Sequence, residues 1–132
     1  MRWFYLPIVL LLFTSCLSNK NTLKTKNTQE FIQKIKKENF DSNKIEEKFN
    51  KSRDFVILVN NIDRGIGYPN VIEFVVIDLV NKKNIYRDSV IDGSVSWKDN
   101  DVIRIKRIPD VRSKDDEVNK KPELKRINVR NL

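Results

Sequence analysis

The sequence predicts an α+β fold in which an N-terminal amphipathic helix packs on an antiparallel β-meander of about five to six short strands. Two observations lead to this class. Apolar residues recur at helical spacing between residues 27 and 52, whereas short β-branched runs alternate with turn residues from residue 54 onward. The chain has 132 residues, which is enough for one small globular domain.

The helical segment carries a thin apolar stripe. Bulky apolar residues lie four apart at two places and mostly polar residues separate them, as in Phe31/Ile35 and Ile45/Phe49. The sequence Asp-Ser-Asn at 41–43 can cap a new helix. We therefore expect either one helix or a split pair over residues 28–39 and 43–51, with the stripe packed against the sheet.

The second half of the chain alternates as strands do. Short β-branched segments bounded by turn residues occupy 55–59, 71–80, 85–91, 94–97, 102–108 and 124–129. Asp92-Gly93 predicts a two-residue type I′ turn, because both positions of that turn need a positive φ. This turn would form a hairpin in which Ile91 pairs with Ser94.

The turn at 81–84 predicts the register of the strands around it. It would place Tyr86 opposite Leu79 and Arg87 opposite Asp78, the latter as a cross-strand ion pair. One sheet face, which we expect under the helix, would then carry Val75, Ile77, Leu79, Tyr86, Val90, Val95 and Trp97. The strand at 71–80 is also partly apolar on its other face, so we expect it to be central and covered on both sides.

The C-terminal part combines a charged stretch with a last strand. Nine of the fourteen residues at 110–123 are charged, and we expect a mobile loop there. The final strand should close against the sheet, because Ile127 and Val129 alternate with polar residues.

The chain begins with the segment MRWFYLPIVLLLFTSC. Its apolar run at 3–13 is shorter than the ~20 residues that cross a bilayer, and has the length of a signal-peptide core. The ending FTSC resembles the lipobox of bacterial lipoproteins, although Leu is usual where Phe13 stands. The resemblance implies that residues 1–15 are removed and that Cys16 carries a lipid anchor. An uncleaved anchor, or a secreted protein with a stray cysteine, is the alternative.

The residues after the cysteine define the domain organisation. Residues 16–27 are polar and lack periodicity, so we expect a flexible tether, followed by a single domain over 28–132. Three lysines in the tether could be attracted to anionic lipid, and a solvated spacer explains them equally well.

The chain as a whole resembles small lipoproteins of AT-rich Gram-negative bacteria of the Bacteroidota type. The shared pattern is a lipobox, a polar tether, a Lys-rich helix and a short β-meander. The resemblance implies an envelope location and no particular activity. In the related sorting rules, an Asp after the cysteine or an early acidic cluster redirects the protein. Residues 17–20, LSNK, have neither, which implies an outer-membrane anchor facing the periplasm.

The composition argues against most catalytic and metal chemistry. The chain has no His and one Cys, which removes the usual zinc sites and nucleophile-activating schemes. The acidic clusters at 99–101 and 115–117 do not match a calcium loop. We expect no enzyme activity, no catalytic residues, no metal and no cofactor.

The charge is distributed unevenly. The net charge is +8, and the excess of basic residues lies in 20–53 and 101–132 rather than in 54–100. A nucleic-acid-binding sheet would carry exposed aromatic residues between basic ones, whereas Tyr86 and Trp97 are predicted to lie in the core. We therefore expect no nucleic-acid partner, and an anionic lipid or envelope polymer fits the charge better.

The loop at 62–70 is the candidate contact surface. It contains Arg64, Ile66 and Tyr68 with two of the three glycines. These side-chain types are suited to protein interfaces, although a long hairpin loop explains them as well. The expected function is a membrane-anchored, non-catalytic binding or accessory module with an envelope protein partner. An immunity-type lipoprotein that neutralises a periplasmic toxin, or a cryptic envelope enzyme, is the alternative.

Overall fold

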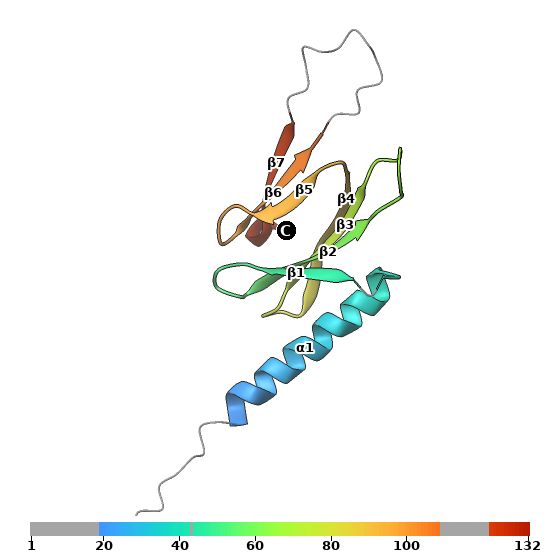
Figure 1. The fold of residues 1–132 in the computed structure, drawn as a ribbon. Coiled ribbons are helices and arrows are strands. Elements are labelled where there is room, and N and C mark those ends of the chain that lie inside the picture. The colour runs from blue at the N-terminus through green and yellow to red at the C-terminus, as the bar shows by residue number, and fades with distance from the viewer. Residues whose placement is uncertain (1–18, 43, 109–121) are drawn as a thin grey trace, which may run out of the picture.

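The computed structural model describes residues 19–42, 44–108 and 122–132. Within them the chain forms one α-helix and seven strands, and it ends in a short 3₁₀ helix (Figure 1). The elements are α1 (Asn19–Asn39), β1 (Ile45–Phe49), β2 (Phe55–Ile62), β3 (Val71–Asp78), β4 (Lys83–Ile91), β5 (Ser94–Trp97), β6 (Val102–Arg107), β7 (Glu123–Asn128) and η1 (Val129–Asn131). The predicted α+β class is confirmed, with more strands than expected.

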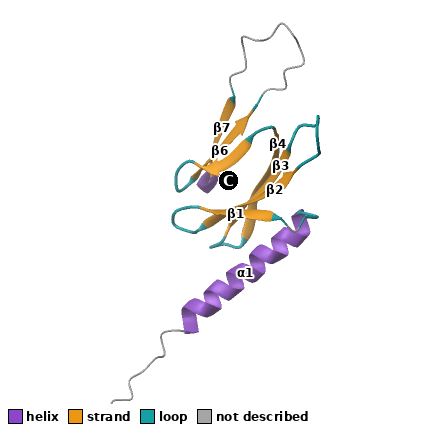
Figure 2. Cartoon of the chain, in the orientation of Figure 1, coloured by secondary structure: helices purple, strands orange, loops and turns teal. Residues whose placement is uncertain are grey.

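The strands form two antiparallel sheets rather than one meander. Sheet A contains β1 to β4 and sheet B contains β5 to β7, each in sequence order (Figure 2). Alternate residues of the two sheets share one core, whose fully buried members are Ile57, Phe74, Val76, Ile103 and Ile105. The molecule is therefore a small sandwich, and its core lies between the sheets.

The outer face of sheet A is covered by α1. Ile32, Ile35 and Phe40 pack on a second core formed by Val56, Leu58, Val75 and Ile77. Burying one such aliphatic side chain contributes about 1.5–3 kcal/mol, so a few residues hold the helix in place. The predicted packing of an amphipathic helix on the sheet is confirmed.

Strand β3 is central, as its two apolar faces predict. It pairs with β2 on one side and β4 on the other. Val75 and Ile77 point to the helix side, whereas Phe74 and Val76 point into the sandwich. Both faces of this strand are thus removed from solvent.

The predicted helix over 43–51 is wrong, because this segment contains strand β1. β1 pairs antiparallel with β2, and Ile45 lies opposite Asn60. A spacing of four residues places two side chains on one face of a strand as well as on one face of a helix. Ile45 and Phe49 therefore lie on the same face of β1 and pack on the core under α1.

The predicted tether at 16–27 is wrong from Asn19 onward, because α1 already begins there. Adding a residue to an existing helix costs far less than nucleating one, and residues 19–27 contain neither Pro nor Gly. The docked part of α1 can therefore extend toward the N-terminus.

The predicted hairpin at Asp92-Gly93 is wrong, because β4 and β5 belong to different sheets. Asp92 has a φ of 44°, but Gly93 is not among the residues with positive φ. Ser94 pairs with Lys106 instead of Ile91. The chain crosses here from sheet A to sheet B.

The predicted register between β3 and β4 is also wrong. Tyr86 lies opposite Val76, and Asp78 lies opposite Lys83, with a register shift between Val76 and Ile77. The turn starts early because the Asp78 carboxylate accepts hydrogen bonds from the backbone N–H groups of Val80 (2.9 Å) and Asn81 (2.8 Å).

The early turn and the division into two sheets change which residues lie under the helix. Val75, Ile77 and Leu79 lie there as predicted, whereas the other four members of the set pack between the sheets: Tyr86, Val90, Val95 and Trp97. No ion pair joins Asp78 to Arg87 among the residues that the structure describes.

The last strand closes against a sheet as predicted. β7 pairs with β6, and Ile127 and Val129 pack on the sandwich core. Most of the predicted mobile loop at 110–123 lies outside the described residues, and β7 begins at Glu123.

Candidate functional site

The loop between β2 and β3 has a defined shape. The Asp63 carboxylate accepts a hydrogen bond from the backbone N–H of Gly65 (2.8 Å), and the N–H of Tyr68 donates to the Gly65 carbonyl (3.3 Å). Gly65 and Gly67 have φ values of 89° and 87°, a region that residues with a side chain rarely adopt. The glycines therefore form the bends that carry the candidate contact residues.

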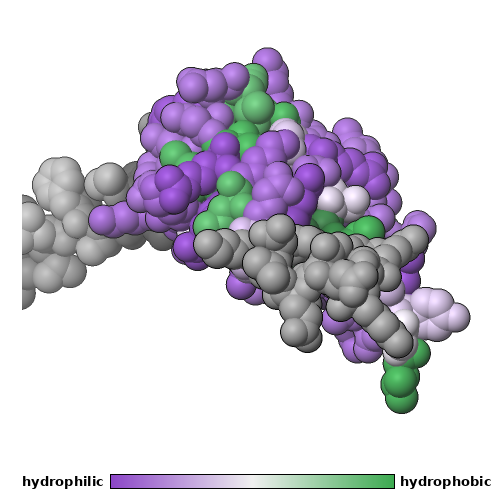
Figure 3. All heavy atoms as spheres, turned by 90° about the horizontal axis from the view of Figure 1, so that it is seen from above, coloured by the Kyte–Doolittle hydropathy of each residue, from purple (hydrophilic) through white to green (hydrophobic). Residues whose placement is uncertain are grey.

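The structure places all three candidate contact residues on this loop, exposed to solvent. Ile66 is fully exposed and Tyr68 is 69% exposed, and Arg64 is exposed as well. Figure 3 shows that hydrophilic residues dominate one face of the molecule, with a small apolar projection at its edge. Exposed single apolar residues are common, but a bulky aliphatic and an aromatic residue on one short loop form a potential contact.

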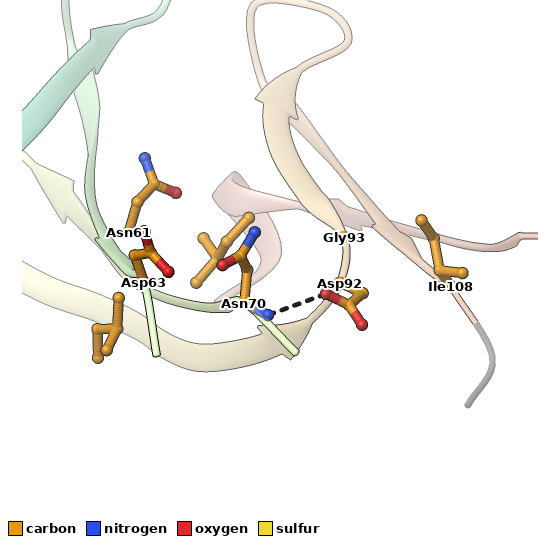
Figure 4. A pocket seen from close by; sticks show the side chains of 8 residues that line it. Asn61, Asp63, Asn70, Asp92, Gly93 and Ile108 are labelled. Atoms are coloured by element: carbon orange, nitrogen blue, oxygen red, sulfur yellow. Dashed lines mark hydrogen bonds between the residues drawn. The ribbon is translucent and has the colours of Figure 1, made fainter. Parts of the chain in front are cut away.

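A groove of about 580 Å³ adjoins the loop (Figure 4). It is lined by Asn61, Ile62, Asp63, Asn70, Ile72, Asp92, Gly93 and Ile108. Its polar rim consists of amides and carboxylates, and Ile108 lies on the wall across from Asn61 and Asp63. A groove of this composition can accept an apolar side chain and backbone N–H donors of a bound chain.

One wall of the groove is fixed by paired hydrogen bonds. The Asp92 carboxylate accepts a hydrogen bond from the backbone N–H of Asn70 (2.9 Å), and the Asp92 N–H donates to the Asn70 carbonyl (2.9 Å). These bonds join the start of β3 to the crossing between the sheets. The loop is thus tied to both sheets at its base.

The groove was not predicted from the sequence. It combines the end of β2, the start of β3, the crossing at Asp92 and the end of β6. A hairpin turn at Asp92-Gly93, which the sequence predicts, would not bring these segments together. The sequence signal for the groove is a set of polar residues near the ends of the strands: Asn61, Asp63, Asn70 and Asp92. Only the arrangement of the strands in two sheets brings them together.

The acidic cluster at 99–101 has a structural role. The Asn100 side-chain oxygen accepts a hydrogen bond from the Ser52 N–H (2.8 Å), and buried Asn50 donates to the Asn100 carbonyl (2.8 Å). Asp101 forms an ion pair with Arg130 (2.8 Å). The hydrogen bonds of Asn100 join the β1–β2 turn of sheet A to the β5–β6 turn of sheet B, and the ion pair joins the β5–β6 turn to η1. The cluster at 115–117 lies outside the described residues. Among the described residues, no group of three potential metal ligands is found.

The two aromatic residues predicted to be in the core are partly buried. The Trp97 indole N–H donates to the Lys48 carbonyl (2.7 Å), and the Tyr86 hydroxyl donates to the Asp88 carboxylate (3.0 Å). Both rings pack against the core between the sheets. They help to join sheet A to sheet B.

The lipidation candidate Cys16 lies outside the described residues. Across the part of the chain that the structure describes, no helix is long and apolar enough to cross a membrane. No protein-family model matches the sequence, and neither the curated proteins nor the solved structures compared with it contain a significant match.

Proposed function

We propose that the protein is a lipid-anchored envelope lipoprotein that acts as a non-catalytic binding module and contacts a protein partner through the loop at 62–70. The observation that carries the proposal is the exposure of Ile66 and Tyr68 on a loop of defined shape. An aromatic ring, an apolar side chain and the guanidinium of Arg64 are the groups that most often anchor protein interfaces.

The defined shape of the loop favours binding. A loop that must be ordered when it meets a partner loses conformational entropy, which weakens the complex. Here the Asp63 carboxylate and the hydrogen bonds between Asn70 and Asp92 fix the loop at its base. The loop therefore loses less conformational entropy when it binds a partner.

The groove extends the contact surface beyond the loop. Its volume of about 580 Å³ is large enough to accept one or two side chains of a partner. Ile62, Ile72 and Ile108 offer apolar contact, and Asp63 and Asp92 can accept N–H groups. A protein segment that has an apolar side chain flanked by N–H groups would fit this arrangement.

The anchor and the contact surface are compatible. The resemblance to lipoproteins assigns the anchor to Cys16, three residues before α1 begins. Figure 1 shows the β2–β3 loop at the end of the molecule away from the start of α1. A protein held at Cys16 therefore leaves the loop accessible, and we place it on the outer membrane facing the periplasm.

The proposal is tested by crosslinking in cells from a photoreactive residue at Tyr68. The matched control is the same residue at Leu124, which is 54% exposed and lies in β7, away from the loop. We expect one specific protein to be captured at position 68 and none at position 124. Capture of the protein at position 124 alone would contradict the proposal.

A second substitution in the same experiment addresses the role of Ile66. Ile66→Asp should abolish capture at position 68 without changing the melting temperature, because the fully exposed side chain is not part of either core. The identity of the captured protein then distinguishes an accessory module from the immunity-type alternative, in which the partner is a toxin.

A further inference from the structure

One end of sheet A combines basic and apolar residues in two adjacent turns. We propose that this basic end, formed by the turns at 50–54 and 79–83, lies against the anionic surface of the membrane that holds the protein. The proposal rests on the lipid anchor of the proposed function. It adds to that anchor a second contact with lipid, which would fix the orientation of the domain on the membrane.

The charge of this end is the first argument. Lys51, Arg53, Lys82 and Lys83 are exposed, and none of them forms an ion pair with another described residue. The acidic residues nearby are Asp54 and Asp78, and the Asp78 carboxylate accepts hydrogen bonds from its own turn. The two turns therefore present an excess of positive charge.

The opposite end of sheet A differs in charge. The β2–β3 loop contains Asp63 and Arg64, which cancel, and Asp92 after β4 is offset by Lys44 before β1. An anionic surface would therefore attract the basic end more strongly than this one. The same electrostatic asymmetry would turn the contact residues of the loop away from the membrane.

Apolar exposure is the second argument. Val80, at the tip of the β3–β4 turn, is 70% exposed, and half-buried Leu79 precedes it. Basic residues around an exposed apolar residue are the combination that interfacial membrane segments use, because the apolar group enters the headgroup region while the charges remain outside. Each basic residue close to such a surface raises the affinity roughly fivefold.

The position of the anchor is the third argument. The Lys82 ammonium donates a hydrogen bond to the Asn27 side chain of α1 (2.8 Å), and a groove of about 320 Å³ runs between α1 and both turns. The helix from Asn19 to Asn27 spans about 12 Å at 1.5 Å per residue. The three Cα–Cα steps from Cys16 to Asn19 add about 10 Å at most. The anchor thus lies within about 22 Å of the basic end.

The view of the whole molecule agrees with this estimate. Figure 1 shows the β3–β4 turn on the same side of the molecule as the start of α1, and the β2–β3 loop on the other side. An anchor at the N-terminus can therefore hold the turns at the surface.

The experiment uses the full lipidated chain in vesicles. Cys16 is the one cysteine of the sequence and its thiol is consumed by the lipid, so Val80→Cys supplies a single free thiol for an environment-sensitive fluorophore. In vesicles that contain anionic lipid, we expect a blue shift of the emission and quenching by a headgroup-labelled lipid. A fluorophore at Ile66→Cys should show neither.

Charge reversal provides the matched comparison. Lys51→Glu/Lys82→Glu, or vesicles of neutral lipid alone, should lower the membrane-contacting fraction of the fluorophore at least roughly tenfold. Lys37→Glu/Lys106→Glu changes the net charge equally at exposed positions elsewhere and should leave this fraction unchanged.

Two outcomes would overturn the proposal. One is a water-exposed fluorophore at position 80 in anionic vesicles, and the other is an equal effect of both charge reversals. Fatty-acid labelling of Cys16, measured separately, shows whether the anchor itself exists. If it does not, Cys16→Ser/Val80→Cys tests the same lipid contact without an anchor, so the two failures are distinguishable.

Discussion

Gly93 owes its place in the molecule to space rather than to backbone freedom. A Cβ atom at this position would overlap the carbonyl oxygen of Lys106 and a methyl group of Val90. The chain passes closely between the two sheets here, since β4 ends at Ile91 and β5 starts at Ser94. The sequence correctly marks Gly93 as a special position, but for the wrong reason.

Gly93→Ala should therefore lower the free energy of unfolding by roughly 2 kcal/mol or more, because the added methyl group forces backbone and core to shift. Gly67→Ala, at a positive φ but with open space around it, should cost only about 1 kcal/mol. Chemical denaturation of both variants checks the difference. Equal losses would show that the close approach does not govern position 93.

At the residue scale the sequence predicts the exposed loop at 62–70 but not the groove beside it. Arg64, Ile66 and Tyr68 are exposed on one loop, because their positions depend on local turn residues alone. The groove beside them depends on Asp92 and Ile108, which come from other parts of the chain. Local patterns cannot reveal such a site until the pairing of the strands is known.

The β3–β4 turn shows how a single carboxylate fixes an element. Burial would raise the pKa of Asp78, but hydrogen bonds from the backbone and side chain of Asn81, from the Val80 N–H, and the charge of Lys83 outweigh it. The pKa of Asp78 therefore lies below its ordinary value of 3.8. The carboxylate form is the one that holds the turn.

This direction predicts the pH dependence of stability. A lowered pKa in the folded state stabilises the protein above the unfolded pKa, and the stabilisation is lost as the pH falls through the folded value. The urea midpoint should thus decrease below about pH 4. Asp78→Asn should lower the midpoint at pH 7 and flatten its change between pH 4 and pH 2. Parallel curves for the two proteins would contradict the role of Asp78.

At the element scale the strands are predicted well, and the errors have specific causes. β2 to β7 lie close to their predicted ranges, because β-branched alternation bounded by turn residues is a local signal. The sequence predicts a helix at β1, because the spacing of Ile45 and Phe49 suits both structures. It predicts the wrong β3–β4 register, because the shift near Val76 follows from the turn geometry.

In the whole molecule, the start of α1 and the β2–β3 loop lie at opposite ends (Figure 1). α1 begins beside the predicted lipid anchor, and the β2–β3 loop lies at the other end (Figure 1). The division into two sheets could not be predicted, because the link at Asp92-Gly93 resembles a hairpin turn. Only the packing of residues such as Val95 and Ile103 against Phe74 decides between the two topologies.

The anchor itself is tested by Cys16→Ser. This change should abolish metabolic labelling of the protein with fatty acid and release it from the membrane fraction, because the hydroxyl cannot replace the thiol as the site of lipid attachment. Ser15→Ala, next to Cys16, keeps the thiol and a small residue and is the control. Unchanged labelling in the Cys16→Ser variant would contradict the lipoprotein assignment.

The central position of β3 has a consequence for folding. Because its residues belong alternately to the core under α1 and to the core between the sheets, neither core can form fully without this strand. Loss of either core exposes one face of β3 to solvent and lowers the stability of the other core. We therefore expect the helix and both sheets to unfold as one cooperative unit, and hydrogen exchange should show the β3 amides exchanging with solvent last.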